Sequence, residues 1–452
     1  MRFVAATAVV LAALGGSPAH ANGRAPVTNG VHFQTGDPRS LYVATTFGLL
    51  VSHDDGCTFR WICEQNIGYG GTFDPKYRIA ADGTLFATTF SGLRVSRDGG
   101  CTFTTATAEQ AAGSPGALAG IWIDAIDIGP TGEVWVATAD SGRPNNIYRS
   151  TDNGVTFAPR GMLSPSIWWK SLAIAATRPQ RVYATGYQVA GVAPDAGQLP
   201  PTAHFEITDD GGDTWTESPL AGVAYGPTPL VYAVGVDHLN PDMVFMTSTG
   251  ANPPSGDRLY RSIDGGVTWT DVLATQGQIL DVAITQAGIM VATLAGGYQS
   301  LDAGATFAPI ANSPQLACVG QRSDGAIFGC AANWQPDNEA VARTATGATW
   351  DKVFRFSSLS GAVECPAGTG QHEQCESQWP TLQKQFGADG PATCGAAPPV
   401  VDAPVVTPPA ASGGCCDADA SSPGALVGIA AIAAIVGLVT WRRRGRKKAC
   451  CS

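Results

Sequence analysis

The chain has few charged residues, and basic residues are especially scarce in its central part. Only 14% of its 452 residues are charged, with 27 Lys and Arg against 37 Asp and Glu. Arg2 and six residues of the stretch 442–448 account for seven of these basic residues, so the remaining 20 leave the body with a net charge of about −17. A body this acidic is not expected to bind nucleic acid or other acidic surfaces.

Closely spaced cysteine pairs are also missing from the body of the chain. No C-x-x-C motif occurs there, so a zinc site of that type is not expected. The acidic loop TDDGGDT, residues 208–214, resembles a calcium-binding loop, but it is one copy of a repeated turn described below, with additional acidic residues. We therefore predict neither a metal nor a cofactor.

Long hydrophobic runs occur only near the two ends. Arg2 precedes an apolar run over residues 3–14, and Ala19-His20-Ala21 fits a signal-peptidase site, so residues 1–21 are predicted to be a signal peptide. This run is too short to span a bilayer. The mature chain is therefore expected to begin near Asn22 and to be exported, which permits disulfide bonds.

Two local disulfides are predicted from the spacing of the cysteines. Cys318 and Cys330 lie at equal distances from Asp324, so a hairpin centred there would place them on opposite strands. A second bridge is expected between Cys57 and Cys63, which are only six residues apart.

One eight-residue pattern, S-x-D-x-G-x-T followed by Trp or Phe, recurs along most of the chain. The copies start at residues 52, 96, 150, 208, 262, 300 and 343, at intervals of 38 to 58 residues, and the last copy has lost its Ser and its Asp. A period of this size indicates a propeller or a solenoid. The Asp accepts hydrogen bonds from backbone N–H groups a few residues later, and the Gly supplies a positive φ. The predicted turn-forming acids are Asp54, Asp98, Asp152, Asp210, Asp264 and Asp302.

Each copy lies within a larger unit of four short strands. In the third unit, IDAIDIG, EVWVAT and NIYRS precede the pattern, and TFAPR follows it. Four short strands joined by tight turns are typical of a propeller blade. We predict an all-β propeller of seven blades over residues 22–356, with six or eight blades as the alternatives.

The repeated pattern resembles the Asp-box, or BNR, repeat of sialidases, sortilin-type receptors and several glycoside hydrolases. The resemblance covers residues 30 to 356 and implies a propeller in which the box has a structural role. Sialidases carry an R-I-P motif ahead of the first box, whereas the nearest match here, Arg78-Ile79-Ala80, follows it and lacks the Pro. Sialidase activity is therefore not expected.

Candidate ligand-binding residues cluster where the chain enters the inner strands of the third and fourth blades. They are Trp122, Trp168, Trp169 and Lys170, and exposed aromatic faces there would stack on sugar rings or hold peptide side chains. Burial between blades is the alternative. These loops, together with the unequal connections between second and third strands, are expected on the face opposite the boxes, although the unequal lengths also fit unselected drift.

Two acidic residues are weak candidates for catalysis. Asp124 and Asp281 occupy equivalent positions early on the inner strands of the third and sixth blades, where they would face the central channel. A glycoside hydrolase needs two carboxylates flanking the bond. The alternative is that each carboxylate binds a nearby backbone N–H.

The C-terminal part contains the second strong sequence signal. A cysteine-bearing cap (357–395) is followed by a Pro-rich linker (396–414). Cys101 has no obvious partner in the sequence. The motif Gly413-Gly414-Cys415-Cys416 then precedes an apolar stretch, 424–441, and a basic tail. The stretch is long enough for a transmembrane helix, with its basic end in the cytoplasm.

This order of Gly-Cys motif, helix and basic cluster over 415–452 resembles the MYXO-CTERM sorting signal. The resemblance implies a sorting protease, cleavage near Cys415 and Cys416, and transfer to the cell surface or outer membrane. A permanent membrane anchor is the alternative. We therefore expect an exported propeller that binds a glycan or a protein, with a glycoside hydrolase as the alternative function.

Overall fold

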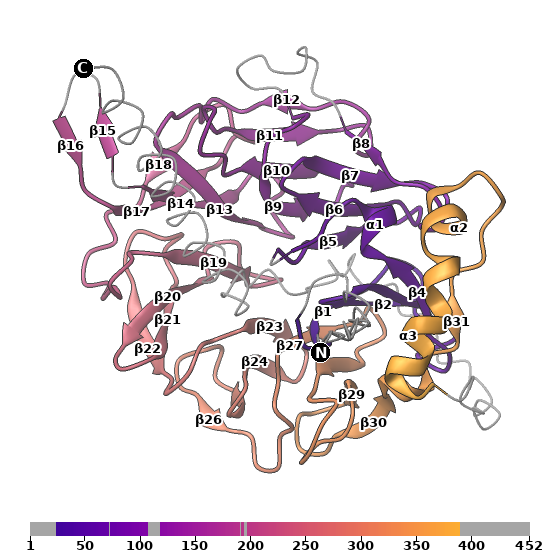
Figure 1. Ribbon diagram of the computed structural model, residues 1–452. Coiled ribbons are helices and arrows are strands. Elements are labelled where there is room, and N and C mark those ends of the chain that lie inside the picture. The colour runs from indigo at the N-terminus through magenta and orange to yellow at the C-terminus, as the bar shows by residue number, and fades with distance from the viewer. Residues whose placement is uncertain (1–23, 72, 107–117, 190, 194–196, 389–452) are drawn as a thin grey trace, which may run out of the picture.

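The computed structural model describes residues 24–71, 73–106, 118–189, 191–193 and 197–388. In these residues seven four-stranded antiparallel units surround a central axis (Figure 1), so the predicted seven-bladed all-β propeller is confirmed. The predicted signal peptide, linker and sorting signal, including the predicted transmembrane helix 424–441, lie outside the described residues. Within the described part, no helix combines the length and apolar character needed to cross a membrane.

The blades follow one another along the chain, and each begins with its innermost strand. Blades one and two contain β1 (Thr28–His32), β2 (Leu41–Thr45), β3 (Gly48–Ser52), β4 (Arg60–Cys63), β5 (Tyr77–Ile79), β6 (Leu85–Thr89), β7 (Gly92–Ser96) and β8 (Thr104–Thr105). Blades three and four contain β9 (Ile123–Ile128), β10 (Val134–Thr138), β11 (Ile147–Ser150), β12 (Ala158–Pro159), β13 (Ile167–Ile174), β14 (Val182–Gln188), β17 (Thr202–Thr208) and β18 (Thr216–Glu217). A separate hairpin, β15 (Gly191–Ala193) and β16 (Gly197–Leu199), lies in the connection between β14 and β17.

The remaining blades have the same plan. Blades five, six and seven contain β19 (Val231–Val236), β20 (Val244–Asn252), β21 (Gly256–Ser262), β22 (Thr270–Ala274), β23 (Asp281–Thr285), β24 (Gly288–Thr293), β25 (Gly296–Ser300), β26 (Ala308–Pro309), β27 (Cys318–Gln321), β28 (Ile327–Cys330), β29 (Val341–Thr344) and β30 (Asp351–Phe354). The C-terminal segment adds β31 (Gly361–Ala362), α2 (Gly370–Gln374) and α3 (Trp379–Phe386), with 3-10 turns at Phe356–Ser358 and Glu376–Gln378, and α1 (Glu64–Ile67) follows β4.

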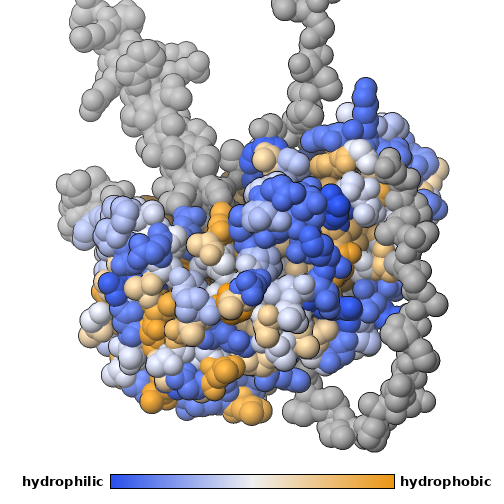
Figure 2. All heavy atoms as spheres, turned by 90° about the horizontal axis from the view of Figure 1, so that it is seen from below, coloured by the Kyte–Doolittle hydropathy of each residue, from blue (hydrophilic) through white to orange (hydrophobic). Residues whose placement is uncertain are grey.

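The second strands are buried on both faces because each blade packs between two others. All five residues of β10, VWVAT, are buried, as are all five of β2 and β6. A strand with both faces covered has an almost continuous apolar sequence instead of an alternating one. The outer strands β8, β18 and β26 have only two residues each and are largely exposed, and the rim of the molecule is mostly hydrophilic with scattered hydrophobic residues (Figure 2).

The repeated turn closes through its Asp and Ser side chains. In the copy at Ser262, the Oδ1 atom of Asp264 accepts the backbone N–H of Thr268 at 2.9 Å, and Oδ2 accepts the Thr268 hydroxyl at 2.6 Å. The Ser262 hydroxyl donates to Asp264 at 2.8 Å and accepts the N–H of Gly266 at 2.8 Å. The copies that start at residues 52, 150, 208 and 300 have the same four hydrogen bonds, whereas the copy at residue 343 has lost its Asp.

The glycine of the repeated turn has a packing role besides its positive φ. Gly154, at φ 75°, lies so close to Phe86 of the preceding blade that a Cβ would be 2.4 Å from the ring. Gly304, at φ 80°, meets Phe245 of the preceding blade at 2.5 Å in the same way. The turns therefore set the contact between neighbouring blades as well as the direction of the chain.

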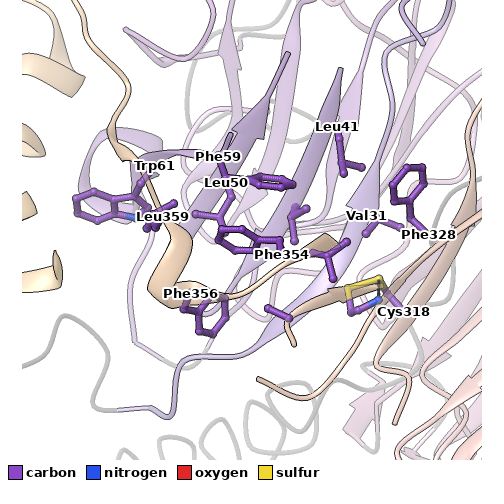
Figure 3. Packing of buried hydrophobic residues seen from close by; sticks show 14 of the residues in the cluster. Val31, Leu41, Leu50, Phe59, Trp61, Cys318, Phe328, Phe354, Phe356 and Leu359 are labelled. Atoms are coloured by element: carbon purple, nitrogen blue, oxygen red, sulfur yellow. Dashed lines mark hydrogen bonds between the residues drawn. A yellow bond between two sulfur atoms is a disulfide. The ribbon is translucent and has the colours of Figure 1, made fainter. Parts of the chain in front are cut away.

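The ring closes without exchanging a strand between the first and last blades. All four antiparallel strands of blade one come from the N-terminal part, and all four of blade seven from the C-terminal part. Their interface is a shared hydrophobic core, in which Phe59 and Phe354 lie 4.4 Å apart and Val31 packs near Phe328 (Figure 3). Beyond this interface, β31 pairs in parallel with β4, and α2 and α3 lie along the outside of blade one (Figure 1).

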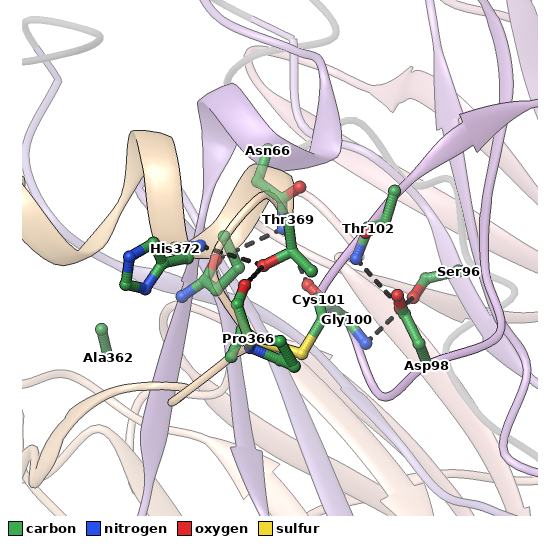
Figure 4. Close-up of a disulfide and its surroundings, with 12 residues drawn as sticks. Asn66, Ser96, Asp98, Gly100, Cys101, Thr102, Ala362, Pro366, Thr369 and His372 are labelled. Carbon is green, nitrogen blue, oxygen red and sulfur yellow. Dashed lines mark hydrogen bonds between the residues drawn. A yellow bond between two sulfur atoms is a disulfide. The ribbon is translucent and has the colours of Figure 1, made fainter.

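Three disulfides are defined in the described residues, and one of them was predicted. Cys318 and Cys330 are bonded across β27 and β28, so that prediction is confirmed. The prediction of a Cys57–Cys63 bridge is wrong, because Cys63 is bonded to Cys375. Cys101, which had no obvious partner, is bonded to Cys365 (Figure 4). The cysteine-bearing segment is thus attached to blades one and two, and only partly covers the last blade.

Candidate ligand-binding face

The topology gives the ring two different faces. The repeated turns join third to fourth strands on one face, which we call the box face, together with the turns between first and second strands. The connections between second and third strands, and the entries into the inner strands, lie on the other, which we call the loop face. In the described part of the chain, the aromatic side chains that are more than a third exposed are all in loop-face connections: Phe90, Tyr225 and Trp334.

An aromatic cluster covers the loop face where blades two, three and four meet. Phe90, in the turn between β6 and β7, lies 4.8 Å from Trp122, which precedes β9. Phe73, just ahead of β5, lies 4.5 Å from Phe90, and Trp168 on β13 lies 5.9 Å from Trp122. Phe90 is 45% exposed and Trp122 is partly exposed, whereas Phe73 and Trp168 are 9% and 8% exposed. The cluster therefore presents two accessible rings supported by two buried ones.

Three charged side chains, one from each of blades two, three and four, lie next to this cluster. Lys170 on β13 forms an ion pair with Asp124 on β9, and its Nζ lies 4.9 Å from the centre of the Trp122 ring. Lys76, which precedes β5, reaches the other oxygen of Asp124 at 2.8 Å. Burial is the main cause that lowers the pKa of Lys76 to about 8, and the Asp124 carboxylate acts in the opposite direction. The carboxylate thus joins two ammonium groups at the edge of the aromatic surface.

A second ion pair ties the same inner strands further along their length. Arg78 on β5 donates to Asp127 on β9 at 3.2 Å, and the other oxygen of Asp127 accepts the N–H of Ile174 on β13 at 3.1 Å. Asp127 is buried, and desolvation raises its pKa. Blades two, three and four are therefore linked twice by buried polar groups, which gives the aromatic cluster a rigid base.

The structure corrects the expected exposure of both candidate tryptophans on β13. Trp168 is only 8% exposed. Trp169 is 1% exposed, belongs to the core between blades three and four, and donates its ring N–H to the carbonyl of Met162. It cannot stack on a ligand. Successive residues of a strand point to opposite faces, so Trp168 and Trp169 were not both able to line one surface. Lys170, also a candidate, is 6% exposed and is engaged with Asp124.

The two candidate catalytic carboxylates have separate sets of partners. Asp124 binds the lysines of blades two and four, as described above. Asp281 is 1% exposed, and its oxygens accept the N–H groups of Val282 and of Val319 on the inner strand of blade seven, both at 2.9 Å. Each carboxylate therefore fastens neighbouring inner strands, which is the alternative role considered from the sequence.

Three residues of this site were not recognised in the sequence: Phe73, Phe90 and Lys76. A comparison of repeats would have indicated Phe90, because the equivalent turn of blade one carries Phe47. Phe47 is covered by the C-terminal segment, with Phe356 at 5.1 Å and Phe386 at 4.9 Å. Among the described residues, no segment covers Phe90 in this way, and its ring is 45% exposed.

Comparisons with known proteins give limited similarity. No family model matches the chain. A curated relative, xyloglucanase Xgh74A of Acetivibrio thermocellus, is 29% identical over 163 residues, which cover 32% of this chain but only 16% of the relative.

Two solved structures with similar folds are the GH74 xyloglucanase of Xanthomonas campestris and YCF48 of Cyanidioschyzon merolae. The first is 16% identical, covers 75% of this chain and 61% of its own, and has a TM-score of 0.46. The second is 14% identical, covers 68% and 96%, and has a TM-score of 0.44. At these values neither carries an argument about activity.

Proposed function

We propose that this propeller is a binding module for a glycan, which it holds on the aromatic cluster of its loop face. The observation that carries the proposal is the pair of accessible rings, Phe90 and Trp122, 4.8 Å apart on a base made of Phe73 and Trp168. Sugar rings stack on such faces, and Lys76, whose side chain is partly exposed, supplies a polar group at the edge for ring hydroxyls. Xyloglucan is the first glycan to test, because the curated relative is a xyloglucanase.

The chain's surface chemistry supports a neutral ligand. The net charge of the full chain is −10, which would disfavour an acidic polysaccharide, while sparse charged residues and exposed aromatics suit an uncharged one. Export and display on the cell surface, as expected from the sequence, would place the loop face where such polymers occur. A protein ligand on the same face is an outcome of the binding screen described next.

The experiment is isothermal titration of the exported chain with a panel of neutral oligosaccharides headed by xyloglucan fragments. Replacing Phe90 or Trp122 with Ala should weaken binding about 2- to 12-fold each, since a stacked ring contributes about 0.5–1.5 kcal/mol. Leu301→Ala is the matched control, because Leu301 is 81% exposed on the box face. Equal affinities of the Phe90, Trp122 and Leu301 variants would refute the proposed site.

A glycoside hydrolase is the second candidate, favoured by the match to a xyloglucanase. Against it, both oxygens of Asp124 are bound by lysines, and both oxygens of Asp281 are bound by backbone N–H groups. Neither carboxylate is placed to protonate a leaving group. Release of new reducing ends from xyloglucan by the wild-type chain, lost in Asp124→Asn, would establish the hydrolase instead.

A further inference from the structure

The outer strands of blade four bring together three side chains that no part of the preceding account uses. His204 and Glu206 are two residues apart on β17, so they lie on the same face of the sheet. Glu217 on β18 is the register partner of Glu206. The structure therefore gathers one imidazole and two carboxylates on one side of the edge of this blade.

The donor atoms of the three residues lie close enough for one ion. The Nδ1 atom of His204 is 2.8 Å from Oε1 of Glu217, and one ligand atom from each residue lies within 4.8 Å of the others. Ligands of a single divalent ion are separated by about 3 Å when each is about 2.0–2.2 Å from the metal. Small rotations of the side chains would complete such a set.

Glu206 gives an independent reason to expect a positive ligand. It is nine-tenths buried, and its carboxylate has no hydrogen-bond or ion-pair partner in the described residues. The charged group that acts on it is another carboxylate, Glu217. By contrast, buried Asp257 accepts two backbone N–H groups. A buried carboxylate without a partner is costly unless a proton or a cation compensates it.

We propose that His204, Glu206 and Glu217 form a binding site for a divalent transition-metal ion, with zinc as the metal best suited to the donors. A nitrogen ligand with two carboxylates matches the ligand preferences of zinc, whereas calcium and magnesium prefer oxygen ligands alone. Because Glu217 is exposed, the ion would be reached from solvent and would keep a position for water. It would fasten the two-residue strand β18 to β17, the strand that follows the longest of the connections between second and third strands.

The test is equilibrium dialysis of the untagged full chain against zinc chloride, followed by metal analysis. The wild type should bind one zinc more per chain than Glu206→Gln or His204→Gln, which remove a ligand with little change of shape. Glu339→Gln is the matched control, because Glu339 is also a buried carboxylate but lies outside the cluster.

Folding and binding are separated by a further variant. Glu217→Gln changes an exposed residue, so the chain should stay folded while losing the extra zinc. Zinc should also raise the melting temperature of the wild type and of Glu339→Gln, but not of the three ligand variants. Equal zinc content in all variants, or no zinc in the wild type, would overturn the proposal.

Discussion

Removal of the Cys101–Cys365 disulfide should destabilise the propeller by about 4 kcal/mol. The bond joins residues 264 apart, but Cys63–Cys375 already brings the same two regions together. With that bond intact, the unfolded chain still connects the two cysteines through 38 residues from Cys63 to Cys101 and 10 from Cys365 to Cys375. Loop-closure entropy for a loop of about 48 residues is about 4 kcal/mol, compared with about 6 for an isolated loop of about 264.

The assay is guanidinium unfolding of the oxidised protein, with Cys101→Ser/Cys365→Ser compared with the wild type. Both cysteines are partly exposed, so serine leaves no buried cavity. Cys318→Ala/Cys330→Ala is the comparison, because the Cys318–Cys330 bond closes a loop of only 12 residues. Its removal should lower the free energy of unfolding by about 3 kcal/mol through loop entropy. Lost packing should lower it further, because both cysteines are buried. An unchanged unfolding midpoint for Cys101→Ser/Cys365→Ser would refute the idea that attachment of the C-terminal segment to blade two stabilises the propeller.

Three further perturbations test the core, the turns and a buried histidine. Trp169→Ala should lower the free energy of unfolding by about 3–5 kcal/mol because it empties a core position, whereas Phe90→Ala should change it by less than about 0.5 kcal/mol. Similar melting temperatures for the two variants would place Trp169 outside the core. Asp264→Ala should cost about 1–3 kcal/mol by leaving turn N–H groups without an acceptor, and an unchanged denaturation midpoint would show that the turn is held by other means. Burial lowers the pKa of His32 from 6.5 to about 3. Below pH 6.5 the unfolded chain therefore binds a proton that the folded chain does not bind, and the free energy of unfolding decreases as the pH decreases. Between pH 6.5 and 4.5 the loss should be about 2 kcal/mol smaller in His32→Gln than in the wild type, and parallel stability curves would contradict the buried neutral form.

The blades were predictable because their information is local. The Ser, Asp, Gly and Thr of each turn satisfy one another within seven residues, so the pattern is visible in any sequence window that contains it. The Cys318–Cys330 bridge was predictable for the same reason, since both cysteines belong to one hairpin. The partners of Cys63 and Cys101 lie 312 and 264 residues away, and no local pattern distinguishes them.

The site was predictable only in part because it depends on what three blades place side by side. Trp122 and Lys170 were found from their positions at the entries to inner strands, and they do meet. Phe90 comes from a different blade, and its exposure depends on the absence of a covering segment such as the one over Phe47. Trp169 was misjudged because its neighbour Trp168, which points to the other side of β13, carries the same sequence signal.

Hydroxyl-radical footprinting with and without a saturating neutral oligosaccharide tests the central claim most directly, because it maps the contact without any mutation. A ligand on the loop face should protect the exposed ring of Phe90 and that of Trp122 from oxidation. Ile263 and Leu301, which are 60% and 81% exposed on the box face, should be oxidised equally in both samples. Protection of the box-face residues, with Phe90 and Trp122 unchanged, would contradict the proposed binding face.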